Sequence, residues 1–144
     1  MNIKELEQPI VDYLKGVYDK LDWENKPDVF RSCDFTESKS QMVVVVGVMD
    51  VQQINFRLPD YRVKLQVSVN VFVDEDESGL IFKELSDLTK QALEEYTLMN
   101  EEDFTLLFPN QGVVCFMEQS FSPRLDPSSR SEVCDIDYEL VISE

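Results

Sequence analysis

Four consecutive acidic residues, 74 to 77, followed by Ser-Gly, form the segment of the sequence closest to a cation site. Positions 1, 3, 5 and 6 of a calcium loop of the EF-hand kind are matched by Asp74, Asp76, Ser78 and Gly79. The match then fails, because position 12, which needs a bidentate Glu, is Leu85. We interpret the acids as residues at a helix start, where carboxylates face unpaired N–H groups and the positive end of the helix dipole.

A second pair of carboxylates, Asp135 and Asp137, stands two residues apart, so both lie on one face of a strand. Some magnesium-dependent enzymes hold their metal with carboxylates at this spacing. The solvated face of an antiparallel strand gives the same pattern. We favour the solvated face and predict no metal site.

Histidine is absent from the chain, which excludes Ser-His-Asp and Cys-His nucleophiles and His-bound zinc. The sequence also has no Gly-rich phosphate loop. Its three cysteines, Cys33, Cys115 and Cys134, never stand in C-x-x-C spacing, so we expect buried, reduced thiols. We therefore predict no catalytic residues, no cofactor and no enzyme activity.

The composition is that of one globular domain, which we expect to span residues 1–144. The net charge of −16 argues against a nucleic-acid-binding surface, since that affinity comes mainly from Lys and Arg. We find neither a signal peptide nor an apolar run long enough to span a membrane, so we expect no membrane partner.

The periodicity of apolar residues predicts two helices and four strands. The helices are expected from Ile3 to about Leu21, beginning near Glu7 or kinked at Pro9, and from about Ser78 onward. The strands are expected at residues 42–51, 61–73, 113–121 and 132–142, with a bulge at Gly47 and a long loop at 22–41 that has room for one short strand. This order, α-β-β-α-β-β, predicts an α+β fold with a mainly antiparallel sheet and two helices packed on one face.

Proline and serine mark the segment "SPRLDPSSRS", residues 122–131, as a loop between the last two strands. We expect it to be an exposed, mobile arm. Its two cations, Arg124 and Arg130, are suited to contacts with acidic groups of a partner, or they simply keep the loop soluble.

Two strands carry polar faces of opposite charge. One shows Arg62 and Lys64, and the last shows Asp135, Asp137 and Glu139. Two arrangements fit this pattern: the strands are neighbours that form cross-strand pairs, or the basic row of one subunit meets the acidic row of another. The second arrangement would make these five residues an assembly interface.

The order and style of these elements resemble a known family. An N-terminal helix such as "IVDYLKGVYDKL", a strand such as "VVVVGV", the alternating strand "YRVKLQVSVNVFV" before the helix "LIFKELSDLTKQAL", and the last strand "SEVCDIDYELVI" are similar to the small tail-terminator and head–tail joining proteins of long-tailed bacteriophages. The resemblance covers nearly the whole chain.

The resemblance implies a subunit of a hexameric ring that caps the tail tube around the path of the DNA. Its partners would be its own copies, the tail tube and the neck or connector proteins, in a virion assembled from protein made in the bacterial cytoplasm. An acidic inner wall would repel phosphate and let DNA slide. The alternatives are an acidic inhibitor that imitates DNA and, third, a carboxylate enzyme that uses Asp135.

Overall fold

Two helices and five strands make up the part of the chain that the computed structural model describes, which is residues 2–35, 41–55, 60–72, 79–99, 108, 112–128 and 130–143. In chain order they are α1 (Ile3–Asp19), β1 (Asp28–Arg31), β2 (Met42–Asn55), β3 (Asp60–Phe72), α2 (Leu80–Met99), β4 (Val113–Asp126) and β5 (Ser131–Ser143). This order corrects our prediction of α-β-β-α-β-β, because segment 22–41 contains a strand, β1.

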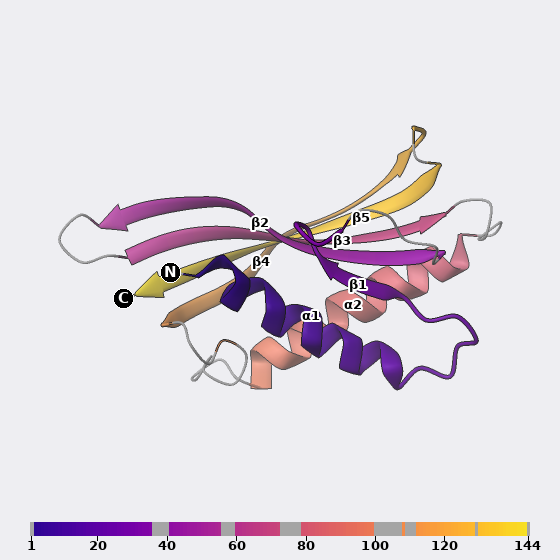
Figure 1. Ribbon diagram of the computed structural model, residues 1–144, viewed down its shortest axis with the longest axis horizontal. Coiled ribbons are helices and arrows are strands. Elements are labelled where there is room, and N and C mark those ends of the chain that lie inside the picture. Colours follow the sequence, from indigo (N-terminus) through magenta and orange to yellow (C-terminus); the bar gives the residue numbers. More distant parts are fainter. Residues whose placement is uncertain are drawn as a thin grey trace.

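The strands form one sheet in the order β1-β2-β3-β5-β4. Neighbouring strands are antiparallel, apart from β1, which pairs parallel with β2. Both helices cover the same face of the sheet and leave the opposite face open (Figure 1). The α+β class, the mainly antiparallel sheet and the one-sided helices are thus confirmed. Neither helix is apolar enough over sufficient length to cross a membrane, within the described residues.

Helix α1 begins at Ile3, where Asn2 caps it by accepting a hydrogen bond from the Lys4 backbone N–H at 3.0 Å. Our alternative of a start near Glu7 is wrong, and Pro9 lies inside the helix. Proline has no N–H, so one hydrogen bond of the first turns is missing.

The core lies between the helices and the covered face of the sheet. Successive side chains of a strand point to opposite faces of the sheet. In β3 the alternate residues from Val63 to Val71 are therefore buried, while those between them face the open side. The largest fully buried side chains come from both helices and from β3 and β5: Leu6, Ile10, Leu14, Tyr18, Leu65, Leu85, Leu93, Ile136, Leu140 and Ile142, together with Phe108.

Two buried tyrosines, Tyr18 and Tyr138, differ in the hydrogen bonding of their hydroxyl groups. The Thr89 Oγ1 donates to the Leu85 carbonyl at 2.7 Å, so the Tyr18 hydroxyl is the donor in its 2.6 Å bond to Thr89. Tyr138 stacks its ring on Phe116, with centroids 4.9 Å apart, but its buried hydroxyl oxygen has no hydrogen-bond partner among the described residues. Burial raises the pKa of both phenols, so both are neutral at every ordinary pH.

Removing each hydroxyl group should therefore change stability in opposite directions. Tyr18→Phe should lower the free energy of unfolding by about 0.5–1.5 kcal/mol, the usual net value of a lost hydrogen bond. Tyr138→Phe should leave it unchanged or raise it by about 1–3 kcal/mol, because a buried unpaired polar group is removed. Urea unfolding of the two variants beside the parent protein tests this. A larger loss for Tyr138→Phe than for Tyr18→Phe would contradict it.

Two details of the predicted strands need correction. Strand β4 continues through Pro123 to Asp126, so the first half of the expected loop 122–131 is strand. Strand β2 has two irregularities against β3, between Val48 and Asp50 and between Gln53 and Asn55, and neither is at Gly47. The space around residue 47 explains the glycine there, because a Cβ would come within 2.8 Å of the Ser32 Oγ.

Two other expectations have different outcomes. The acidic run 74–77 and Ser78 lie outside the described residues, and Gly79, which follows them, has a φ of 72° just before α2. The cysteines are all free, but only Cys134 is buried, while Cys33 is exposed and Cys115 is half-buried. The prediction of buried thiols is therefore right for one cysteine and wrong for Cys33.

Candidate functional site

The open face of the sheet carries the charged rows that the sequence singled out. Strands β3 and β5 are direct neighbours, and the register places Lys64 opposite Glu139, Gln66 opposite Asp137, and Ser68 opposite Asp135. The structure therefore shows the first of the two arrangements, in which the rows face each other within one chain. Whether they also contact another subunit stays a prediction.

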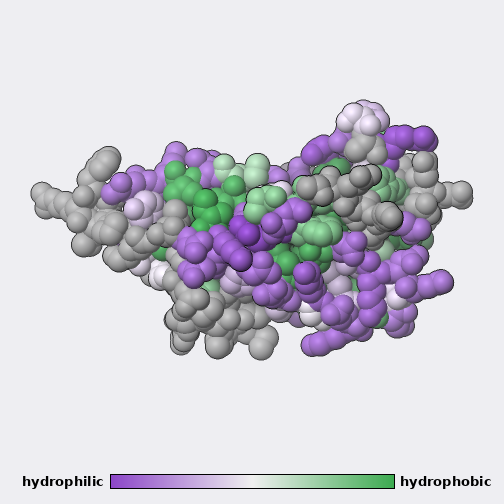
Figure 2. All heavy atoms as spheres, viewed as in Figure 1, coloured by the Kyte–Doolittle hydropathy of each residue, from purple (hydrophilic) through white to green (hydrophobic). Residues whose placement is uncertain are grey.

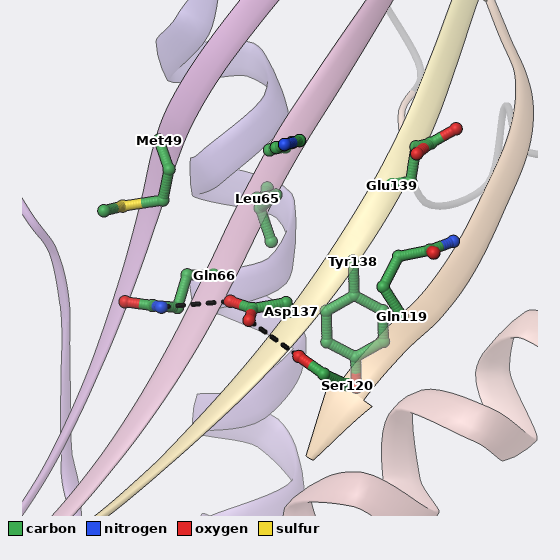
Figure 3. Close-up of a pocket in the computed structure, with 9 residues that line it drawn as sticks. Met49, Leu65, Gln66, Gln119, Ser120, Asp137, Tyr138 and Glu139 are labelled. Carbon is green, nitrogen blue, oxygen red and sulfur yellow. Dashed lines mark hydrogen bonds between the residues drawn. The ribbon is translucent and has the colours of Figure 1, made fainter. Parts of the chain in front are cut away.

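Asp137 is the centre of a polar row that crosses three strands. It accepts hydrogen bonds from the Gln66 Nε2 at 3.0 Å and from the Ser120 Oγ at 2.7 Å. Figure 3 shows the three side chains in a line from β3 across β5 to β4. Both carboxylate oxygens therefore have a donor, which holds the side chain flat along the sheet.

The other two acids of β5 are paired in the same way. Asp135 accepts from the Ser68 Oγ at 2.8 Å and from the Arg124 Nε at 3.3 Å. Glu139 lies 3.2 Å from the Arg62 Nε. Lys64 is exposed and, among the described residues, makes no ion pair. It is the cation of this face that is most available to a partner.

These pairs leave little room for a metal ion. Asp135 and Asp137 already use their oxygens on neighbouring side chains, and the described residues contain no cluster of three or more acidic or cysteine side chains able to hold a metal. The geometry shows how the two carboxylates are held, and the expectation of no metal site stays a prediction.

The open face is hollowed along its length. One hollow of about 430 Å³ lies over Lys64, Gln66, Asp137 and Glu139, and a second of about 480 Å³ lies over Val43, Val45, Ser68 and Phe72. Both include Met49 and Gln66, so together they form one trough, which we call the sheet trough. Its floor mixes apolar and paired polar side chains, which suits a protein surface better than a small polar substrate.

The two arginines of the expected arm are in different settings. Arg124 lies in strand β4 and is hydrogen-bonded to Asp135, so its placement in a loop was wrong. Arg130 lies in the short turn before β5 with a φ of 54°, a left-handed conformation that few non-glycine residues adopt. The mobility of this turn stays a prediction.

Sequence reasoning missed a buried acid at the edge of the sheet. Glu7 of α1 is only 3% exposed, pairs with the Arg31 Nε at 3.0 Å and accepts a hydrogen bond from the Val48 backbone N–H at 2.8 Å. Strand β1 ends at Arg31, so the edge of β2 at Val48 has no strand partner there, and Glu7 takes its place. A signal existed, since Glu7 lies at i+4 from Ile3 and i−3 from Ile10, within the apolar stripe.

The ion pair between Arg62 and Glu139 should matter little to stability. Both side chains are solvent-accessible, at 45% and 25%, so screening leaves at most about 1 kcal/mol. We expect Arg62→Ala to lower the free energy of unfolding by less than this, and Lys64→Ala, the matched control without an ion pair, to change it even less. Chemical denaturation measures both. A loss above about 2 kcal/mol for Arg62→Ala would show that the pair is structural.

Comparisons with known proteins give a match in fold, but none to a family model or to a curated sequence. No protein-family model matches the chain, and no curated protein matches it in sequence. Among solved structures, a chain of the "Virion of native gene transfer agent (GTA) particle" is similar, with a TM-score of 0.60 and 10% sequence identity over 99% of this chain and 96% of that chain. At this identity the similarity shows a shared fold.

Proposed function

We propose that this protein is a structural subunit of a phage or phage-like virion, in the position of a tail-terminator or head–tail joining ring that caps the tail tube around the DNA path. The observation that carries the proposal is the whole-chain similarity in fold to a chain of a gene transfer agent virion. The match leaves almost nothing of either chain unpaired, so it concerns the complete domain and not a common motif.

The chemistry of the described residues supports a structural role. The chain has no histidine, its described part has no metal-binding cluster, and the most regular polar groups are paired with one another across strands. Its net charge of −16 is suited to a ring around DNA, because an acidic wall repels phosphate. We expect the ring to be hexameric, with contacts to the tube and to neck or connector proteins.

We propose the open face as one assembly surface. It carries Arg62, Lys64, Asp135, Asp137 and Glu139 and the sheet trough between them. The three acids already have partners within the chain. Lys64 is therefore the residue of this face whose charge would interact most strongly with a neighbouring subunit or tube protein. The turn with Arg130 is proposed as a second, smaller contact.

The test is the solution mass by light scattering over a range of concentrations, with negative-stain images of the same samples and of samples mixed with tail tubes. We expect closed rings, free or on tube ends. Lys64→Glu should weaken assembly, whereas Lys15→Glu, an equal charge change on the exposed side of α1, should not. A strict monomer that ignores tubes would contradict the proposal and favour the acidic DNA-imitating inhibitor.

A further inference from the structure

The two edges of the sheet are unequally protected. On one side β1 pairs only with Val43–Val46 of β2, so the outer edge of β2 from Val48 to Asn55 has no strand beside it among the described residues. On the other side the outermost strand is β4, which is 14 residues long. Long unpaired edges are templates for pairing with another chain.

The register places the two open edges at the same end of the sheet. Gln52 is opposite Arg62, Arg62 is opposite Val141, and Val141 is opposite Cys115. These four residues form one row from the β2 edge to the β4 edge. At the other end of the sheet, β1 covers β2, and Pro123 removes a backbone donor from β4. The end of the sheet with β1 and Pro123 is therefore protected against pairing with another chain, and the end with Gln52 and Cys115 is open to it.

The strand directions fit pairing between two copies. From β2 through β3 and β5 to β4 every pair is antiparallel, so β2 and β4 point in opposite directions. We propose that the Val113–Glu118 half of β4 in one copy pairs antiparallel with the Asp50–Asn55 part of β2 in the next copy, which extends one continuous sheet around the ring. This inference rests on the proposed function.

Half of the eight large hydrophobic side chains that are exposed among the described residues lie at the same end. Four of the large hydrophobic residues that are exposed lie on α1, β2 or β4 there: Ile3, Met49, Ile54 and Met117, at 44%, 63%, 41% and 52% exposure. Figure 2 shows hydrophobic surface left of centre, and further hydrophobic patches near the middle and on the right of the view, separated by hydrophilic surface. Burial of these side chains would add a hydrophobic contribution to the backbone pairing.

Two backbone N–H groups in this part of β2 have side-chain acceptors in the isolated chain. Glu7 accepts from the Val48 N–H at 2.8 Å, and Asp50 accepts from the Val51 N–H at 2.9 Å. Strand β2 has a bulge at Met49, and β4 has one beside Cys115. Bulges disfavour non-specific pairing of strand edges. They also introduce the curvature that a closed sheet needs. The Val48 N–H keeps its Glu7 acceptor, so a partner strand would pair with β2 beyond Val48.

Cysteine cross-linking tests the pairing directly. The natural Cys115 is kept, exposed Cys33 is changed to Ser, and burial, which raises the pKa of Cys134 to about 11, keeps that thiol unreactive. Gln52→Cys continues the row of Cys115 in the next copy, within the 4.4–6.8 Å Cα separation that a disulfide spans. The matched control is Gln53→Cys, one residue along the same strand and on the opposite face.

Under mild oxidation we expect the Gln52→Cys protein to form covalent multimers at least about tenfold faster than the control. Met117→Lys in the same protein should abolish them, whereas Leu80→Lys, at an equally exposed position at the start of α2, should not. Rings by light scattering without the selective cross-link would overturn this pairing and leave the proposed function intact. Monomers that form no cross-link and no ring, alone or mixed with tail tubes, would overturn both.

Discussion

Glu7→Ala is expected to lower the free energy of unfolding by about 3–5 kcal/mol, the usual cost of removing one partner from a buried ion pair. The change leaves the Arg31 guanidinium, 13% exposed, without its carboxylate, and it leaves the Val48 N–H without an acceptor. The guanidinium then keeps a longer contact, 3.7 Å, with the exposed Asp34, which is a weaker partner than the buried Glu7. Glu7→Gln should cost less, because the amide oxygen still accepts one of the two bonds.

Urea unfolding measures this loss, with Asp12→Asn as the control, an exposed acid on the same helix whose change should stay within about 0.5 kcal/mol. The double variant Glu7→Ala with Arg31→Ala should be less destabilised than the sum of the single variants. Additive losses would mean that the two side chains do not depend on each other, contrary to their 3.0 Å contact.

Ile136→Ala should cost about 2–5 kcal/mol of unfolding free energy through lost apolar burial and the cavity that remains. Ile136 is fully buried in β5, between Val67 of β3 and Phe121 of β4. The strand lies in the middle of the sheet, with backbone pairs on both sides, so little room exists for collapse into the space.

The same experiment on Ile136→Val should give about 0.5–1.5 kcal/mol, since one methylene is removed. Leu80→Ala provides the control, because Leu80 is 59% exposed and its truncation should be nearly neutral. Equal losses for Ile136→Ala and Leu80→Ala would show that Ile136 does not belong to the packed core.

Regular alternation made most of the fold predictable. Strand β3 and strand β5 alternate apolar and polar residues along nearly their whole length, which is the pattern of a sheet with one covered face. Both helices carry a stripe at spacings of three and four. These signals are local, so they need no knowledge of what lies opposite.

The missed features depend on distant partners. Strand β1 has four residues, and it is a strand because β2 lies beside it. Strand β4 passes Pro123 because edge strands tolerate a missing donor, whereas the local sequence there is typical of a loop. The acidic and basic rows were visible in the sequence, but only the register of β3 and β5 showed that they meet within one chain.

The position of β5 constrains the order in which the chain can fold. Strand β4 pairs only with β5, and β5 pairs with β3 across sequence separations that run from Phe72 and Ser131 to Asp60 and Ser143. The β2–β3 and β4–β5 hairpins each close over short loops and should form early. The docking of one hairpin on the other joins distant segments at a higher entropy cost, so we expect it to limit the folding rate.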